Sequence, residues 1–265
     1  MTTYTLIGSA TDTQDNITFS TTSINVQVQN TWPNEPLGLT VVTDYDLVPV
    51  PIPVTQSEVA LTNSWISIYN GRGLLKKDSD STEPVTPPSV LRCDFPIGFT
   101  GGEGPGTLAR SLPGFRRIYG GFSVKVLSPW QGHNTSVNKL SYFVVNGGSC
   151  PLVFYGPAPN GPYQLRAFPF QLAVGGIGPD QWWVPNLDKT PFTIGVWHTI
   201  EWLLDTTIGQ LFWALDGKPQ ANYIGIPMPS IGFIEYHLDP VWGGANDTKR
   251  QNDTILFGHI KISGV

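Results

Sequence analysis

The sequence predicts an all-β protein: a two-sheet antiparallel jelly-roll sandwich with a short N-terminal β-hairpin. Turn-forming residues are abundant in the 265-residue chain, with 29 Gly and 24 Pro, whereas only 13% of the residues are charged. Gly and Pro punctuate short strands and break helices, so this composition is typical of β structure. No window combines a sustained 3.6-residue apolar period with helix caps, and we expect at most a helical turn or two.

The first 30 residues form a unit of their own. Two apolar stretches, 4–8 and 17–28, flank a polar turn, and Ile24, Val26 and Val28 alternate along the second. This pattern predicts a β-hairpin and resembles the last two strands of an immunoglobulin-like domain. A lone hairpin is only marginally stable, so we expect it to pack on the main domain, to pair with a neighbour, or to be the remnant of a truncated module. Residues 31–36 are a predicted linker, and 37–265 the main domain.

Strands of the main domain are expected where short apolar runs are bounded by turn residues. In chain order these runs are 39–46, 64–69, 90–95, 117–128, 139–146, 152–155, 163–174, 232–238 and 255–263. The polar stretch 76–88 is expected to be a loop. The glycine-rich segment 96–106 follows a strand but opens no helix, which excludes a phosphate-binding loop. Many short strands without helices between them predict two packed antiparallel sheets.

The stretch 195–219 reads GVWHTIEWLLDTTIGQLFWALDGKP and predicts a hairpin of two long aromatic strands. Asp216-Gly217 is a tight-turn pair, because Gly accepts the positive φ of a sharp reversal. The stretch resembles the Trp-His hairpin of the concanavalin A-like lectin/glucanase superfamily, and segments 119–143 and 238–264 are similar to it as well. The resemblance covers nearly all of the chain after the linker. It implies a jelly roll with a sugar-facing surface, in a superfamily of lectins, hydrolases, lyases and structural domains.

Charge and hydropathy exclude several functions. The formal net charge is −5, and no basic stripe is present that would neutralise a nucleic-acid backbone. No apolar run is long enough to span a membrane. The N-terminus has neither the basic nor the apolar region of a secretory signal. We still expect an extracellular or virion-associated protein, because a signal can be removed, secretion can use another route, or the protein can be assembled into a virion. Cys93 and Cys150 are the only cysteines, and their pairing is left open.

A groove that binds polysaccharide is expected on one sheet. Aromatic faces stack on sugar C–H surfaces, and Lys or Arg hydrogen-bonds hydroxyls or carboxylates. Strand alternation separates Glu201 from the core face of its strand, and neighbours such as Trp182 and Trp183 point to opposite faces. The residues predicted to bind ligand are Trp130, Lys139, Arg166, Trp182, Trp183, Glu201 and Trp213.

Catalytic motifs are incomplete. Glycoside hydrolysis needs two carboxylates that flank the bond. Compared with the E-x-D-x-E pattern of similar laminarinase-type hydrolases, Leu203 replaces the middle acid and Asp205 stands in place of a Glu. A polysaccharide lyase needs a Tyr or His base and a group that neutralises a uronate, but the Arg-x-Glu and Gln-Ile-His motifs of the lyase families are absent. If the chain is an enzyme, the candidate catalytic residues are His133, Tyr119, Arg166 and Glu201.

Calcium is the ion that the sequence suggests. Asp44 and Asp46 near the first strand, with Asp253 before the last, could bring hard oxygen ligands together where the termini of the main domain meet. The competing interpretation is three solvated turn acids. No other cofactor is expected.

Three functions therefore remain open. We favour a non-catalytic, lectin-like domain that binds a polysaccharide, because the fold resemblance and the aromatic content come without a catalytic signature. The second is a structural protein, a virion decoration, fibre or filament subunit, in which residues 1–30 lend a strand to a neighbouring copy and form a homo-oligomer. The third is a polysaccharide lyase or glycoside hydrolase.

Overall fold

A computed structural model describes residues 4–11, 17–24, 31–45, 67–69, 72–156, 162–168, 183–226, 228 and 231–265. The chain divides into two compact units, Met1–Pro33 and Asn34–Val265. In the first unit, β1 (Tyr4–Thr11) and β2 (Ile17–Ile24) form an antiparallel hairpin with Tyr4 opposite Ile24. The predicted N-terminal hairpin is thus present, while Val26 and Val28 lie outside the described residues.

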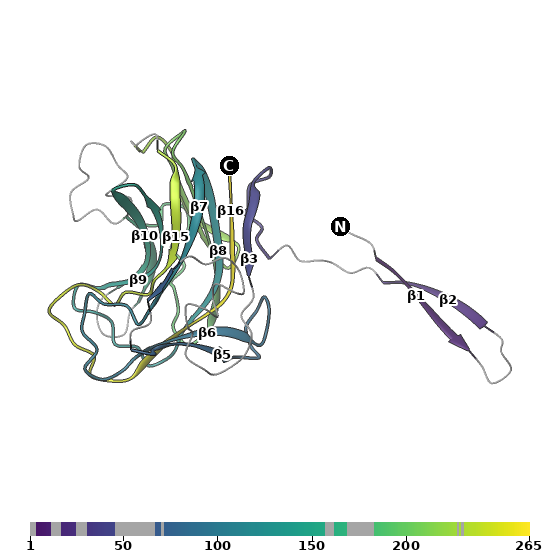
Figure 1. Cartoon of the computed structure of the whole chain (residues 1–265), viewed down its shortest axis with the longest axis horizontal. Helices are drawn as coiled ribbons and strands as arrows, with labels where there is room; N and C mark the ends of the chain where they lie inside the picture. Colours follow the sequence, from purple (N-terminus) through teal and green to yellow (C-terminus); the bar gives the residue numbers. More distant parts are fainter. Residues whose placement is uncertain are drawn as a thin grey trace. The chain divides into compact units, whose positions relative to one another are not determined.

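The second unit is a sandwich of two antiparallel sheets (Figure 1). The six-stranded sheet runs in the order β11 (Gln164–Ala167), β10 (Gly148–Tyr155), β9 (Val137–Val145), β15 (Phe233–Leu238), β7 (Thr107–Phe115) and β4 (Ser67–Tyr69). The eight-stranded sheet runs β14 (Lys218–Tyr223), β13 (Gln210–Leu215), β12 (Trp197–Asp205), β8 (Arg117–Val126), β16 (Asp253–Gly264), β6 (Ser89–Phe95) and β5 (Leu75–Ser79), with β3 (Thr40–Tyr45) also paired to β16. The all-β sandwich is therefore confirmed, and no described residue is in a helix, let alone in one that could cross a membrane.

The central hairpin forms as the sequence predicts. Strands β12 and β13 pair antiparallel with Trp202 opposite Trp213. Strand β14 then pairs back on β13 through a two-residue turn in which Asp216 has a φ of 52° and Gly217 a φ of 74°. Positive φ at both central residues is the requirement of a type I′ turn, which matches the natural twist of paired strands.

Three strands were not expected from the sequence: β5, β7 and β14. Strand β5 overlaps the polar stretch 76–88 that was expected to be a loop. It forms there because an edge strand with one solvent-exposed face needs few apolar residues. Strand β7 contains Pro113 and Gly114, which are turn-forming residues. Strand β14 is short and polar, and its pairing with β13 is what makes it a strand.

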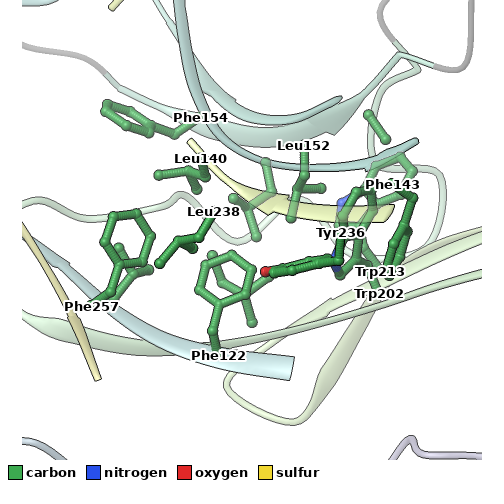
Figure 2. Packing of buried hydrophobic residues seen from close by; sticks show 14 of the residues in the cluster. Phe122, Leu140, Phe143, Leu152, Phe154, Trp202, Trp213, Tyr236, Leu238 and Phe257 are labelled. Carbon is green, nitrogen blue, oxygen red and sulfur yellow. The ribbon is translucent and has the colours of Figure 1, made fainter. Parts of the chain in front are cut away.

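The core lies between the two sheets and is rich in aromatic side chains (Figure 2). The ring of Trp202 stacks on Phe143 with centroids 4.1 Å apart. Gly120 makes this possible, since a Cβ at this position would lie 2.8 Å from Nε1 of Trp202. Cys93 in β6 and Cys150 in β10 are both buried in this core as free thiols, so the disulfide left open by the sequence is not formed.

Candidate functional site

A polar pocket lies on the outer face of the six-stranded sheet. Phe143 and Val145 of β9 point into the core, and alternation turns Tyr142 outward. In β15, Tyr236 and Leu238 are core residues, so His237 points outward as well. The central pocket, as we call it, has a volume of about 390 Å³. Its lining residues are Tyr142, Val144, Val145, Gly147, Gly148, Ser149, His237 and Asp239.

Tyr142 and His237 are direct partners in the pairing of β9 with β15. Directly opposed residues of an antiparallel pair lie on the same face, with Cβ atoms about 5 Å apart. The His237 ring is held by Glu235, whose Oε2 lies 2.7 Å from Nε2. The sheet therefore presents a phenol and an oriented imidazole side by side.

An irregularity in β9 adds a cation to the same face. The register with β10 shifts so that Ser141 pairs with Leu152 while Lys139 pairs with Val153, which leaves Leu140 as an extra residue. Lys139 and Tyr142 are an odd number of residues apart and would face opposite ways in a regular strand. Such a bulge re-aims the side chains next to it, and here Leu140 turns into the core while Lys139 stays outside.

Asp239 follows β15 and completes the pocket. Its carboxyl interacts electrostatically with His237 and Lys139, and Oδ1 accepts a hydrogen bond from Thr107 Oγ1 at 3.0 Å. Burial raises the pKa of Asp239 and lowers that of Lys139. Burial, together with the neighbouring Asp239, also raises the pKa of Tyr142, so this phenol keeps its proton at neutral pH.

Arg166 in β11 is a second cation on this face. It pairs with Val153 of β10, the residue that also pairs with Lys139, so the three side chains share one side of the sheet. Its guanidinium lies over the ring of Tyr155, 4.1 Å from the centroid. Arg166 and Lys139 lie on strands that are two strand spacings apart, a distance of about 10 Å across the sheet. The structure thus brings together these two predicted binding residues, which are 27 positions apart in the sequence.

Tyr119 and Glu201 lie elsewhere, so the prediction that Glu201 shares a groove with Lys139 and Arg166 is wrong, and the candidate catalytic Tyr119 is also far from these two cations. Both are on the outer face of the other, eight-stranded sheet, and both are completely buried. The Tyr119 hydroxyl donates to Glu201 Oε2 at 2.8 Å, and the backbone N–H of Asn34 donates to the same oxygen at 2.8 Å. The segment that begins at Asn34 covers this face.

The tryptophans that were predicted to bind ligand and are described in the structure do not lie in the central pocket either. Trp213 and Trp130 are core residues with at most 1% exposure, so neither ring faces a groove. Trp183 is half-buried at the edge of the sandwich, where its ring meets that of Tyr223 with centroids 4.5 Å apart. Trp182 lies outside the described residues.

His133, the predicted general base, is buried in the loop between β8 and β9. Its ring meets that of Trp242 edge-on at 4.9 Å, and its Nδ1 lies 2.8 Å from Thr135 Oγ1. Burial lowers the pKa of this imidazole. The side chain does not line the central pocket.

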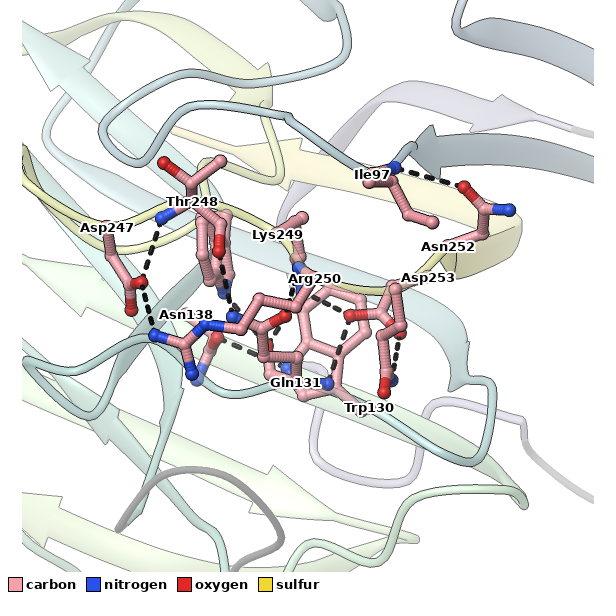
Figure 3. A network of polar contacts seen from close by, with 12 residues as sticks. Ile97, Trp130, Gln131, Asn138, Asp247, Thr248, Lys249, Arg250, Asn252 and Asp253 are labelled. Carbon is pink, nitrogen blue, oxygen red and sulfur yellow. Dashed lines mark hydrogen bonds and ion pairs between the residues drawn. The ribbon is translucent and has the colours of Figure 1, made fainter.

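The three acids of the predicted calcium site do not meet. Asp253 is bound by Lys249 in a buried network at one end of β16 (Figure 3). Asp44 pairs with Lys261, which lies eight residues beyond Asp253 on β16. At the usual rise per residue of a strand, Asp44 and Asp253 are therefore about 26 Å apart. Asp46 is outside the described part of the chain. Among the residues that are described, no group of three His, Cys, Asp or Glu is arranged to hold a metal ion.

The fold is shared with solved polysaccharide lyases. Alginate lyase Aly36B in complex with alginate trisaccharide matches with a TM-score of 0.58 over 84% of this chain and 97% of its own, at 10% identity. Alginate lyase vAL-1 from Chlorella virus matches with a TM-score of 0.54 over 85% and 100%, at 11% identity. The endo-β-1,4-glucuronan lyase of the fungus Trichoderma reesei matches with 0.53 over 77% and 92%, at 12% identity. No protein-family model and no curated protein matches the sequence.

These likenesses establish the architecture. The chain has the concanavalin A-like sandwich fold, as its resemblance to that superfamily implied. Sequence reasoning missed Tyr142 and His237. The alternation of β9 was available as a signal for Tyr142, but the pairing of β9 with β15, some 90 residues away, could not be read from either strand.

Proposed function

We propose that this protein binds an acidic polysaccharide on the outer face of the six-stranded sheet and cleaves it by β-elimination in the central pocket. The observation that carries the proposal is the direct pairing of Tyr142 with His237 in one pocket, beside Asp239 and Lys139. The solved structures named above support the substrate class, since they are lyases of alginate and glucuronan with the same fold.

The reaction class follows from the groups present. In a 4-linked uronate, the carboxylate acidifies the hydrogen on the adjacent C5. Lys139 pairs with that carboxylate and stabilises the charge that builds up on it as the C5–H bond breaks. The C5 proton passes to His237, the C5 electrons form a C4–C5 double bond, and the C4–O4 bond breaks. Tyr142 donates its proton to the departing O4, which becomes the hydroxyl of the new chain end.

The assignment of acid and base rests on the surroundings of each group. Burial next to Asp239 keeps Tyr142 protonated, as a proton donor must be. A neutral imidazole has one ring nitrogen that can accept a proton, and Glu235 holds the His237 ring in place. Arg166, two strands away, extends the positive surface toward further uronate residues.

The test is a panel of alginate, glucuronan and polygalacturonate with two readouts: affinity electrophoresis for binding, and ultraviolet absorbance of the unsaturated product for turnover. Tyr142→Phe should lower kcat by about 100-fold or more while binding persists, because only the transferable proton is lost. Tyr223→Phe is the matched control, since it removes a phenol hydroxyl that lies on β14 of the other sheet and donates to Val184 O. It should leave turnover unchanged.

Each outcome is decisive. Turnover that survives in Tyr142→Phe would overturn the role of this phenol. Wild-type protein that binds a polyuronate without producing unsaturated ends would overturn the lyase step and leave a glycan-binding domain. Absence of both binding and turnover across the panel would overturn the whole proposal.

A further inference from the structure

A second pocket adjoins the central pocket on the same face. It has a volume of about 300 Å³. Its lining residues are Arg72, Gly102, Glu103, Gly104, Pro105, Thr107, Asp239 and Val241. We call it the flanking pocket. Because Asp239 lines both pockets, a ligand that occupies one lies next to the other.

The glycine-rich segment noted in the sequence builds the wall of the flanking pocket. Backbone hydrogen bonds tie it to the loop before β16: Gly101 N–H donates to Asp247 O and Gly102 N–H to Trp242 O, both at 2.9 Å. Trp242 N–H donates in return to Glu103 O at 3.1 Å. The wall is therefore held by several main-chain contacts and presents its backbone to the pocket.

Gly104 is required by close approach. A Cβ at this position would lie 2.7 Å from Oδ1 of Asp239 and 3.5 Å from a methyl group of Val241. Any side chain would thus displace the carboxyl that the two pockets share. The absence of a side chain at Gly104 leaves the Asp239 carboxyl in its place at the border of both pockets.

Arg72 supplies the positive charge of the flanking pocket. Its Nη2 lies 2.8 Å from Glu103 Oε2, and its guanidinium lies 5.6 Å from the centroid of the Phe99 ring. The side chain is half-exposed, at 51%. A guanidinium has five N–H donors, and the contact with Glu103 engages only part of this capacity. Its planar fork matches a carboxylate, and the two contacts orient it in advance.

We propose that the flanking pocket is a second sugar subsite, in which Arg72 binds the carboxylate of the uronate residue next to the one in the central pocket. The inference rests on the proposed function and extends it: Arg72, held by Glu103 of the loop 96–106, selects a substrate that carries carboxylates on adjacent sugars. A chain with isolated uronates would satisfy Lys139 but not Arg72.

The experiment compares Arg72→Gln with Lys218→Gln. Lys218 is an exposed cation paired with Asp188 at the edge of the other sheet, so the control removes the same charge far from the pocket. On a polyuronate, Arg72→Gln should raise KM about 10-fold, the effect of one lost charge-assisted contact, and change kcat less than about twofold. The control should match wild type in both. Equal KM values for the two variants would overturn the subsite.

A second pair of variants tests the border between the two pockets. Gly104→Ala should raise KM on the polymer, because its methyl group meets Asp239. Gly244→Ala places a methyl in open space in the neighbouring loop and should not. Affinity electrophoresis separates the two proposals: if wild type binds a polyuronate without turnover, the lyase step fails, but Arg72→Gln must still bind about 10-fold more weakly. Unchanged binding in Arg72→Gln then overturns the subsite as well.

Discussion

Glu201→Gln should destabilise the protein markedly, because the buried Glu201 carboxylate accepts three hydrogen bonds. Oε2 accepts from Tyr119 Oη and from Asn34 N–H, and Oε1 accepts from Asn34 Nδ2, all at 2.8 Å. A glutamine can place its oxygen toward Tyr119 and the Asn34 backbone, but its NH₂ group then faces Nδ2 of Asn34. The Asn34 amide is not free to turn over, since Nδ2 also donates to Gly217 O at 3.1 Å.

The magnitude follows from these contacts. Hydrogen bonds to a charged acceptor contribute about 1.5–3 kcal/mol, against about 1 for neutral partners. Glu201→Gln weakens the hydrogen bonds from Tyr119 and from the Asn34 backbone by about 0.5 kcal/mol each. It replaces the third hydrogen bond with two N–H donors that face each other, which costs about 2 kcal/mol. The free energy of unfolding should fall by about 3 kcal/mol. For a domain of this size, that lowers Tm by about 6–12 °C.

Urea unfolding followed by tryptophan fluorescence measures this loss. Tyr119→Phe alone should cost about 1.5 kcal/mol, because Oε2 keeps one donor. The double variant should cost less than the sum of the two single losses, since the variants share a hydrogen bond. A loss below about 0.5 kcal/mol for Glu201→Gln, the range of ordinary surface changes, would contradict a buried and covered carboxylate at this position.

Two further predictions concern other buried groups. Lys249→Met should cost about 3–5 kcal/mol, because it leaves the Asp253 carboxylate buried without its cation. Adding Asp253→Asn should recover part of this loss in urea unfolding, and a further loss would contradict the pairing. Burial raises the pKa of Tyr236 above its ordinary 10.0. The folded state therefore holds this proton above pH 10 while the unfolded state releases it, and stability falls as pH rises from there. Tyr236→Phe should flatten that fall by about 1.4 kcal/mol per pH unit, and an unchanged slope would contradict it.

Local patterns accounted for most of the strands. The run 117–128 was expected to be a strand, and in β8 the alternating residues Phe122, Val124 and Val126 lie in the core. The turn residues Asp216 and Gly217 predicted the reversal after β13. Strand β5 was missed, because its own sequence is polar and only pairing with β6 makes it a strand.

The site was only partly predictable for a related reason. Lys139 and Arg166 were named from residue type, yet so were Glu201 and Tyr119, which belong to the other sheet. Alternation says that a strand has two faces. It does not say which sheet the strand joins, or what covers the outer face. The burial of Glu201 depends on Asn34, 167 positions earlier in the chain.

The amino-acid sequence by itself determined the all-β composition, the hairpins closed by local turns, and which side chains of most strands point inward, because these depend on neighbours within a few residues. Only the tertiary structure decided that Tyr142 meets His237, that a bulge brings Lys139 to the same face, and that the glycine loop borders Asp239. Those contacts depend on strand order and register between distant segments, and many registers preserve the same apolar pattern.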